Sequence, residues 1–266
     1  MKVHGKKMIK LIASDLDGTI LRNGAQDCDE RLFPLVKALK ERGVIFAPAS
    51  GRQYPNLKRL FAPVSDDLMY ICENGALVIY KDEIIYEKPM DRELGIEIMR
   101  DIYDYEDCEI LLSGRNTSYL MPKSKEYVHR MKYIVKNNVT IVDNIYEVEE
   151  DLLKISVYNP TDIELCREHF MNKWSDKVQA VISGKQWLDF TAFGVNKGNA
   201  IKAIQEKLEI DKTECIAFGD NYNDIEMFEA VGRSFGMSSA VEDIQRRCTD
   251  ITDCVETELD RILQEM

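Results

Sequence analysis

Two short apolar runs, one near each end of the chain, stop at a carboxylate that stands beside a glycine. The first run, 9–13, leads into D-L-D-G-T at 15–19, and the second, 215–218, leads into G-D-N-Y-N-D at 219–224. In an open α/β sheet, ligands bind at the edge where the carboxyl ends of parallel strands meet. We therefore expect a parallel sheet that brings both acidic segments to one edge.

The segments beside these runs alternate between strand and helix patterns. Apolar residues stand at helical spacing over 31–42, with Asp29 as the expected N-cap and Gly43 as the stop. Further strands are expected at 44–49, 68–72 and 234–237, and further helices at 200–208, 224–231 and 255–265. Strands that alternate with helices predict a doubly wound, Rossmann-like α/β core.

The middle of the chain follows a different pattern. Amphipathic segments at 91–105, 124–136 and 161–174 are interleaved with β-like runs at 109–112, 139–142, 153–158 and 178–182. None of these runs ends in a carboxylate followed by glycine. We expect an α+β domain at 86–188, inserted between the two parts of the core at 1–85 and 189–266. Linkers near 84–87 and 188–190 would join the two domains.

Composition limits the classes of partner. Of the 266 residues, 45% are hydrophobic, which is enough for a substantial core. The 35 basic and 47 acidic residues give a net charge of −12, which argues against nucleic-acid binding but leaves a small anionic substrate open. The sequence leaves the oligomeric state open.

The cellular location is also constrained. The longest stretch without a charged residue is nine residues, 43–51, whereas a membrane helix needs about 20 apolar residues. The apolar segment near the N-terminus reaches Asp15 without a small-residue cleavage site, so we interpret it as a strand and not as a signal peptide. Seven scattered cysteines without a C-x-x-C pair favour a reducing, cytoplasmic location, and the lack of a long apolar stretch predicts no membrane association.

The D-L-D-G-T segment has the residues for phosphoryl chemistry. One of its two carboxylates, Asp15 or Asp17, can attack phosphorus while the other moves protons. Both would repel a phosphate unless a cation neutralised them, which points to Mg²⁺. The alternative is an ordinary Asp-Gly turn. The four fixed positions together would arise by chance in about one chain in a few hundred.

The G-D-N-Y-N-D segment supplies a second group of carboxylates. Asp220 is a candidate metal ligand, and Asp224 could orient it. The alternative is a polar loop followed by a helix N-cap. An EF-hand loop does not fit, because Tyr222 occupies its third ligand position and no glycine follows at the sixth.

Two further segments offer groups that bind phosphate. Ser50, at the end of an expected strand, has a hydroxyl and neighbouring backbone N–H groups that can hold a phosphoryl oxygen. The alternative is a helix cap at Ser50 with Arg52 in solvent. Lys197 opens an expected helix and could stabilise negative charge, although a single lysine is usually a surface residue.

Together these residues resemble a known family. The ordered set D-L-D-G-T, S-G-R, N-K-G and G-D-N-Y-N-D is similar to the haloacid dehalogenase-like superfamily of phosphotransferases, and most to its Cof-type phosphatases with a large type IIB cap. The E-N-G-A segment at 73–76 and the G-D-x-x-N-D-x-x-M form ending at Met227 match that branch as well. The middle of the chain matches the inserted cap only in length and position.

The resemblance implies a role for each acidic residue. Asp15 would be the nucleophile that becomes phosphorylated, and also a ligand of Mg²⁺. Asp17 would be the general acid and base, with its backbone carbonyl on the metal. Asp220 would complete the protein ligands, with Asp224 in support.

It also implies a phosphate-binding set. Ser50, Lys197 and Asn223 would hold the phosphoryl group, together with the backbone N–H groups of Leu16 and Gly51. No motif position departs from the family pattern.

We therefore expect a magnesium-dependent phosphatase of small phosphomonoesters that works through an aspartyl phosphate. A phosphomutase of the same superfamily and a non-catalytic protein that binds Mg²⁺ or a ligand are the alternatives. Sugar phosphates, nucleotides and pyridoxal or flavin phosphates all remain candidate substrates. Arg115, Tyr119 and Lys123 are polar candidates for substrate selection, although as single residues they fit a solvated surface equally well.

Overall fold

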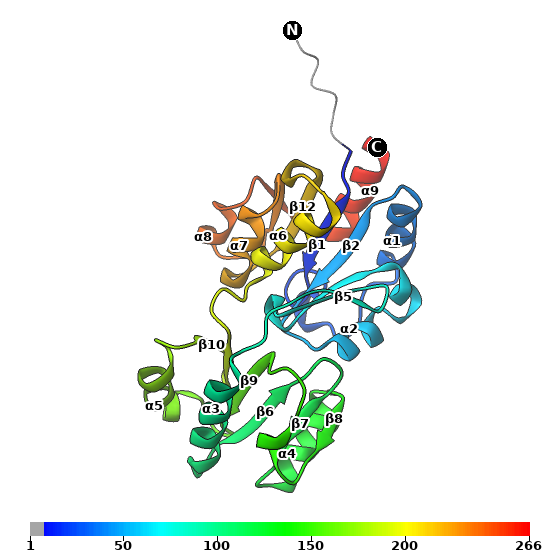
Figure 1. Ribbon diagram of the computed structural model, residues 1–266. Coiled ribbons are helices and arrows are strands. Elements are labelled where there is room, and N and C mark those ends of the chain that lie inside the picture. Colours follow the sequence, from blue (N-terminus) through cyan, green and yellow to red (C-terminus); the bar gives the residue numbers. More distant parts are fainter. Residues whose placement is uncertain (1–7) are drawn as a thin grey trace. The chain divides into compact units, whose positions relative to one another are not determined.

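The structure, a computed structural model, describes residues 8–266 and separates into two units (Figure 1). The first unit contains the described residues up to Arg52, together with Leu57–Tyr86 and Asn196–Met266. The second unit contains Gln53–Asn56 and Glu87–Val195. Residues 1–7, at the start of the expected core segment 1–85, lie outside the described part.

The first unit is built on an eight-stranded sheet, counted over the described residues. Its strands lie in the order β14 (Asp250–Thr252), β13 (Arg233–Met237), β12 (Cys215–Gly219), β1 (Leu11–Asp15), β2 (Ile45–Ala49), β3 (Met69–Cys72), β4 (Leu77–Tyr80) and β5 (Glu83–Glu87). The strands from β14 to β3 pair in parallel, and β4 pairs antiparallel to β3.

The register of the central strands sets where their ends meet. Strand β1 lies between β12 and β2, and every residue of β1 is buried. Ser14 pairs with Phe218 of β12, and Asp15 pairs with Ala49 of β2. The residues that follow these three strands therefore emerge at the same edge of the sheet, as the sequence predicts.

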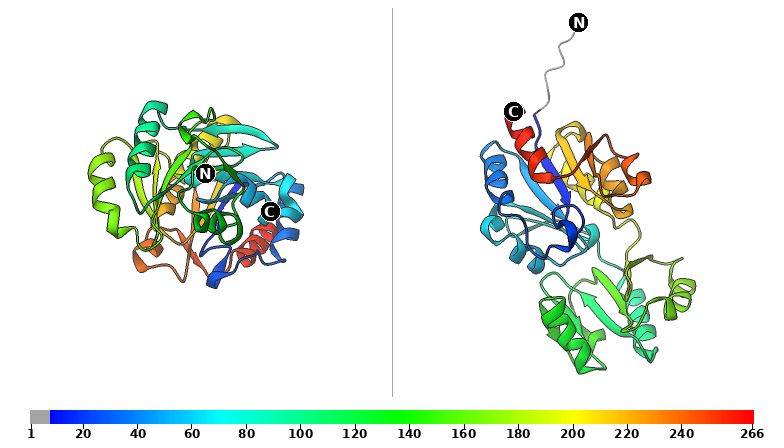
Figure 2. Two further views of the ribbon diagram at one scale, coloured as in Figure 1. Left: turned by 90° about the horizontal axis from the view of Figure 1, so that it is seen from below. Right: turned by 180° about the vertical axis from the view of Figure 1, so that it is seen from behind.

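Helices cover both faces of this sheet. They are α1 (Leu32–Glu41), α2 (Tyr54–Leu60), α6 (Lys197–Leu208), α7 (Ile225–Glu229), α8 (Glu242–Gln245) and α9 (Val255–Glu265). Residues of α6 and α7 pack with Leu11 and Ala13 of β1. Helices α1 and α9 contact each other on the opposite face, which Figure 2 presents from behind.

The second unit has a mixed, mostly antiparallel sheet. Its strands lie in the order β10 (Gln179–Gly184), β11 (Trp187–Thr191), β9 (Lys154–Tyr158), β6 (Glu109–Ser113), β7 (Ser118–Leu120) and β8 (Val139–Ile141). Helices α3 (Arg92–Asp104) and α5 (Glu164–Trp174) supply the apolar core on one face. On the other face, α4 (Lys125–His129) and the π-helical turn after it place Tyr127 and Met131 against Leu111.

The expected fold class, a doubly wound α/β core with an additional α+β unit, is confirmed. Both expected linkers are strands, and only the first of them contains a boundary between the two units, after Tyr86. Residues 84–87 form most of β5, which follows β4 through a turn at Lys81 and Asp82, both with positive φ. Residues 188–190 lie inside β11, which pairs with β9 and β10. Strand pairing, which a local pattern does not reveal, orders both segments.

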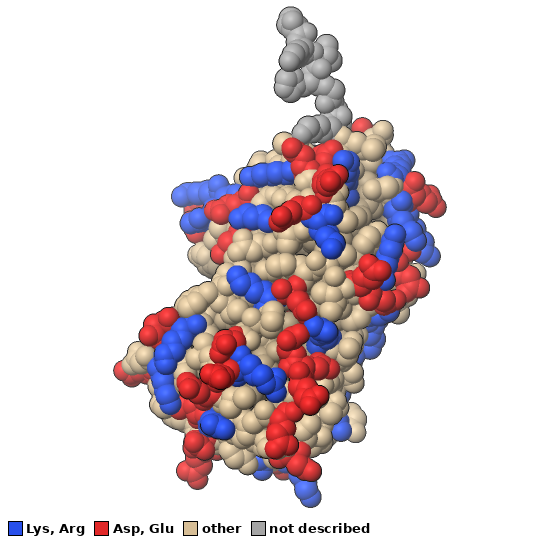
Figure 3. All heavy atoms as spheres, in the orientation of Figure 1, with Lys and Arg blue, Asp and Glu red and all other residues tan. Residues whose placement is uncertain are grey.

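The start of α1 differs from the expected one. Helix α1 begins at Leu32, and the Asp29 carboxylate accepts from the Arg31 N–H and side chain instead of capping the helix. Within residues 8–266, no helix is both long and apolar enough to cross a membrane. On the face drawn in Figure 3, acidic and basic side chains are interspersed.

Candidate active site

The sheet edge gathers the acidic residues that the sequence singled out. Asp15 is the last residue of β1, and Asp220 directly follows β12. One carboxylate oxygen from each of Asp15, Asp220 and Asp224 lies within 4.8 Å of the others. Because β1 and β12 are neighbours in parallel register, residues 205 positions apart in the chain meet at one point.

Lys197 lies inside this group and not on the surface. It is the first residue of α6, whose N-cap Asn196 accepts from the Asn199 N–H. Its side chain is 1% exposed, and Nζ donates to Asp15 Oδ1 and, at 2.6 Å, to Asp224 Oδ1. We call Lys197, Asp15, Asp220 and Asp224 the core cluster.

The start of α6 is held close to the loop after β3. Gly75 in that loop has φ +100°, and a Cβ there would lie 2.4 Å from the Asn196 carbonyl oxygen. Only glycine allows this approach, which fixes the backbone next to Lys197. The E-N-G-A segment therefore has a structural contact with the N-K-G segment.

Asp224 is the most completely bonded carboxylate of the core cluster. Its Oδ2 accepts from the N–H groups of Asp220 at 3.0 Å and Asn221 at 3.1 Å. With Asn221 it forms a capping box on the turn Tyr222–Asp224, so the alternative of a loop with a helix cap holds for this turn, although the Asp224 side chain does not cap α7 itself. Since its Oδ1 accepts from Lys197, Asp224 holds the loop and the ammonium together.

Asp15 is less well satisfied. Its Oδ2 is buried and accepts no hydrogen bond from a described residue. Burial raises the pKa of the Asp15 carboxyl to about 8; the Lys197 ammonium opposes that rise, and Asp224 adds to it. Burial also raises the pKa of Asp220. For Lys197, burial alone would lower the pKa, but Asp15 and Asp224 raise it above its usual value.

The electrostatics are those of a site with surplus negative charge. One ammonium stands among three carboxylates, and a buried carboxylate without a counter-charge tends to take up a proton. Carboxylate oxygens suit hard cations such as Mg²⁺. The unpartnered Oδ2 of Asp15 and the nearby oxygens of Asp220 therefore fit a divalent cation.

Asp17 lies apart from this cluster, in the turn that follows β1. Its side chain is 59% exposed and receives two hydrogen bonds from Arg52, Nε–Oδ2 at 3.1 Å and Nη2–Oδ1 at 2.5 Å. The alternative of a solvated Arg52 is therefore wrong. Sequence reasoning missed this contact, although the S-G-R segment at the end of the neighbouring strand was a signal.

The turn itself is tightly constrained. Gly18 has φ +98°, and a Cβ there would lie 2.2 Å from Asp220 Oδ2, so no other residue fits. Thr19 is fully buried, and its Oγ1 donates to Asp220 Oδ1 at 3.0 Å. Sequence reasoning gave Thr19 no role, although it is the last position of the D-L-D-G-T motif.

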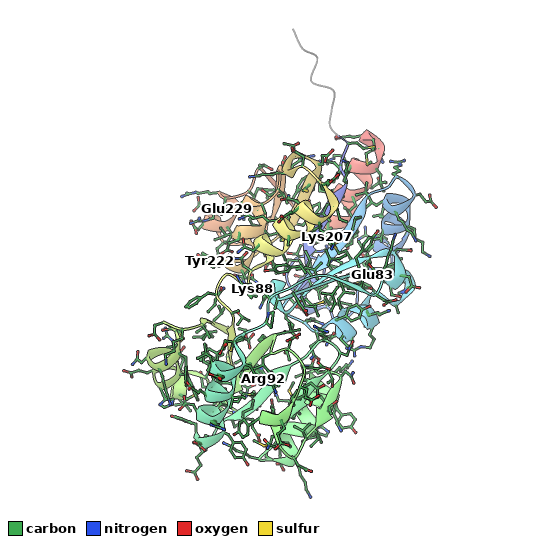
Figure 4. All side chains as sticks on the ribbon, in the orientation of Figure 1. Glu83, Lys88, Arg92, Lys207, Tyr222 and Glu229 are labelled. Carbon is green, nitrogen blue, oxygen red and sulfur yellow. The ribbon has the colours of Figure 1, made fainter. Side chains whose placement is uncertain are left out.

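The predicted phosphate-binding residues differ in how they are placed. Ser50 is buried directly after β2, and its Oγ accepts from the Arg52 N–H at 3.2 Å. Leu16 is buried beside Asp15, and Gly51 follows Ser50. Asn223 is exposed in the turn before α7, next to the exposed Tyr222 that Figure 4 labels.

The three polar candidates of the inserted domain have partners within the second unit. The Arg115 guanidinium donates to Glu87 and Asp151. Tyr119 donates its hydroxyl to Glu150 at 2.9 Å. Lys123 Nζ donates to a backbone carbonyl at 2.7 Å. Each side chain is thus held by its own unit.

Comparison with known proteins follows the same lines. The family model of haloacid dehalogenase-like hydrolases matches residues 12–260. A 5-amino-6-(5-phospho-D-ribitylamino)uracil phosphatase of Escherichia coli is 28% identical over 234 residues, 87% of this chain and 86% of the relative.

Solved structures are similar over nearly the whole chain. One is a protein of Eubacterium rectale, with a TM-score of 0.88 and 28% identity over 98% of this chain and all of the other. Another is the sugar phosphatase BT4131 of subclass IIB, with a TM-score of 0.76 and 20% identity over 95% of this chain and 98% of the other. The second likeness concerns the fold alone.

Proposed function

The chain belongs to the haloacid dehalogenase-like hydrolases, and we propose that it is a magnesium-dependent phosphatase that hydrolyses small phosphomonoesters through an aspartyl phosphate. The observation that carries the proposal is the state of Asp15. Its carboxylate ends the central strand, is held through Oδ1 by the buried Lys197, and keeps a buried Oδ2 without a partner.

We propose that Asp15 is the nucleophile. An Asp15 oxygen attacks phosphorus, the bond from phosphorus to the ester oxygen breaks, and Asp17 gives its proton to the departing alkoxide. A water that loses a proton to Asp17 then attacks the phosphoryl group. The bond to Asp15 breaks, and inorganic phosphate leaves.

The other residues hold and neutralise the phosphoryl group. The Lys197 ammonium balances charge on the transferring group, and the Ser50 hydroxyl, the Asn223 amide and the N–H groups of Leu16 and Gly51 bind its oxygens. Asp15, the Asp17 carbonyl and Asp220 would hold Mg²⁺, with Asp224 as support. When bound, Mg²⁺ supplies positive charge that offsets the repulsion between the carboxylates and the phosphate.

The proposed substrate is a small phosphorylated metabolite. The similarity to a phosphatase of a ribityl phosphate supports this class, which includes sugar phosphates and phosphorylated cofactors. We propose that the second unit is the cap domain that selects among them. We also propose a cytoplasmic location, on the basis of the cysteine pattern.

The proposal is tested by phosphate release. The assay uses a panel of phosphomonoesters, with Mg²⁺ and with EDTA. The panel contains sugar phosphates, nucleotides, pyridoxal and flavin phosphates, and 5-amino-6-(5-phospho-D-ribitylamino)uracil, the compound in the name of the Escherichia coli relative. Wild type is compared with Asp15→Asn and with the control Asp101→Asn, which removes a carboxylate of the second unit. We expect release that requires Mg²⁺, that disappears in Asp15→Asn and that persists in Asp101→Asn.

Two outcomes would contradict the proposal. Near-normal release by Asp15→Asn would rule out Asp15 as the nucleophile. No release from any compound would favour a phosphomutase or a non-catalytic binder, and trapping of an aspartyl phosphate would distinguish these two.

A further inference from the structure

A chain of hydrogen bonds runs from the core cluster to the first turn of the C-terminal helix. It begins at Thr19, whose Oγ1 donates to Asp220 Oδ1 at 3.0 Å. The Thr19 carbonyl accepts from Arg22 Nη1 at 3.2 Å. Arg22 Nη2 donates to Glu256 Oε2 at 2.9 Å, across 234 positions of sequence. One guanidinium thus joins the turn after β1 to α9.

Glu256 is a glutamate that is almost completely buried. It lies in the first turn of α9 and is only 2% exposed. Its Oε2 also accepts from Cys254 Sγ at 2.8 Å, whereas its Oε1 is buried and accepts no hydrogen bond from a described residue. A helix N-terminus favours an anion, and the Arg22 guanidinium gives this carboxylate a paired counter-charge.

The turn between Thr19 and Arg22 is closed on itself. The Leu21 N–H donates to the Leu16 carbonyl at 2.7 Å, and the Gly18 N–H donates to the Leu21 carbonyl at 3.0 Å. A displacement of Arg22 is therefore passed to Thr19 through a short, bonded segment. The Thr19 hydroxyl is the part of that segment that touches Asp220.

We propose that Arg22 and Glu256 are positioning residues that set the affinity of the core cluster for its divalent cation. The inference rests on the proposed function in that it takes Asp220 as a ligand of the cation. Glu256 fixes the Arg22 guanidinium, Arg22 fixes the Thr19 carbonyl, and Thr19 holds Asp220 through Oδ1. Loss of a group bonded directly to a metal ligand, as Thr19 is here, commonly weakens metal binding by about 10–100-fold. Arg22 and Glu256 act through Thr19, so we expect an effect at the lower end of this range.

The alternative is that the Arg22–Glu256 pair only fastens α9 to the first unit. The two readings differ in what a substitution changes. A fastening role lowers the temperature of unfolding and leaves the bound cation unaffected once the protein is folded. A positioning role weakens cation binding in the folded protein and leaves the rate at saturating cation largely unchanged.

The chain offers a matched control in Glu258. This residue lies in the same first turn of α9 and is 6% exposed, but its partners are Thr252 and Arg261. Glu256→Gln and Glu258→Gln therefore remove the same charge from the same helix. Only the first interrupts the connection to Arg22 and Thr19.

The experiment measures binding of Mn²⁺ by electron paramagnetic resonance in the absence of substrate, for wild type, Arg22→Gln, Glu256→Gln and Glu258→Gln. We expect about tenfold weaker binding in Arg22→Gln and Glu256→Gln and an unchanged affinity in Glu258→Gln. The double variant of Arg22 and Glu256 should bind no more weakly than either single variant, because both act through one path. At saturating Mg²⁺, kcat and KM for a phosphomonoester should stay within about twofold of wild type.

The proposal is overturned if Arg22→Gln and Glu256→Gln bind Mn²⁺ as tightly as Glu258→Gln, whatever their unfolding temperatures. It is also overturned if all three variants lose affinity equally, because the effect would then belong to α9 in general. Failure of the proposed function has a different signature. A wild type that binds Mn²⁺ with this pattern but releases no phosphate would contradict the phosphatase and support the positioning role.

Discussion

The two units each contain a carboxylate that is bonded to a lysine, Asp15 in the first and the half-buried Asp101 in the second, and the two carboxylates differ in how fully their oxygens are hydrogen-bonded. In the core cluster, Lys197 is shared between Asp15 and Asp224, and Asp220 lies nearby. In the second unit, Asp101 of α3 is surrounded by donors from α5. The core cluster leaves a buried carboxylate oxygen without a partner, whereas both oxygens of Asp101 have partners.

Both oxygens of the Asp101 carboxylate have hydrogen-bond partners. Its Oδ1 accepts from Lys173 at 2.5 Å, its Oδ2 accepts from Trp174 Nε1 at 2.7 Å, and His169 Nε2 lies 3.1 Å from both oxygens. Burial raises the pKa of Asp101, but the bonds from Lys173, Trp174 and His169 outweigh it and lower the pKa below its usual value. This carboxylate is ionised and satisfied by its own unit.

Asp15 has fewer donors than it needs. Its Oδ2 is unpartnered, and burial raises its pKa to about 8. A fold that only stabilised itself would have no use for three carboxylates around one ammonium, because each unpaired buried charge destabilises the native state. The difference between the two clusters supports the proposal that a ligand from outside the chain is the partner of Asp15 Oδ2.

The largest expected effect comes from removing the two lysines in turn. Lys197→Met should destabilise the metal-free protein by about 3–5 kcal/mol, because it leaves buried carboxylates without a counter-charge. Lys173→Met should cost about 1 kcal/mol or less, because Lys173 is 47% exposed and Asp101 keeps two other donors. Urea unfolding in EDTA near neutral pH measures both.

The two lysine variants should also differ in how much Mg²⁺ stabilises them. Adding Mg²⁺ should restore part of the stability of Lys197→Met and none of that of Lys173→Met. Equal losses in the two variants would mean that the core cluster is no more strained than the Asp101 cluster.

The second effect is stabilisation by the cation itself. A ligand that binds only the native state stabilises it by about 2.7 kcal/mol at a concentration of 100 times Kd. We expect Mg²⁺ to raise the stability of wild type and of Asp101→Asn to this extent. In Asp220→Asn, most of this stabilisation by Mg²⁺ should be absent. Thermal unfolding with and without Mg²⁺ measures the shift. An undiminished shift in Asp220→Asn would place the cation elsewhere.

Much of this organisation could be predicted from the sequence, because it depends on local residue patterns. Helix α9 has the bounds that the apolar spacing predicts, 255–265, and β12 begins at Cys215 as expected. The sequence predicts that Asp15 and Asp220 lie at the same edge of the sheet, because the carboxyl ends of parallel strands point the same way. The family match agrees with these motifs.

The rest depends on contacts between distant segments. The sequence predicts linkers where β5 and β11 lie, because pairing with a neighbouring strand, and not their own residue pattern, makes these segments strands. The bond from Arg52 to Asp17 spans 35 positions, and the bond from Thr19 to Asp220 spans 201. The sequence alone gives no signal for Glu256, which lies far from every motif.

The smallest expected effect concerns the Asp101 carboxylate and is tested by the pH dependence of stability. Asp101→Asn should destabilise the protein by about 1.5 kcal/mol near neutral pH, because charge-assisted hydrogen bonds are lost. The pKa of Asp101 is lowered from 3.8 in the native state, so its contribution is complete above that value and is lost as the pH falls through the native pKa. Urea unfolding of both proteins from about pH 6 down to about pH 2 should therefore give a gap that is constant at first and then narrows.

Phosphate release at neutral pH serves as the control, since Asp101 lies outside the core cluster and its variant should keep the rate of wild type. A gap that stayed open at the acid end would mean that the shape of the Asp101 side chain, and not its charge, stabilises the second unit. Asp101 would then no longer be an example of a carboxylate that stabilises its fold in the ionised form. The contrast with Asp15, for which we propose a cation as the partner, would be lost with it.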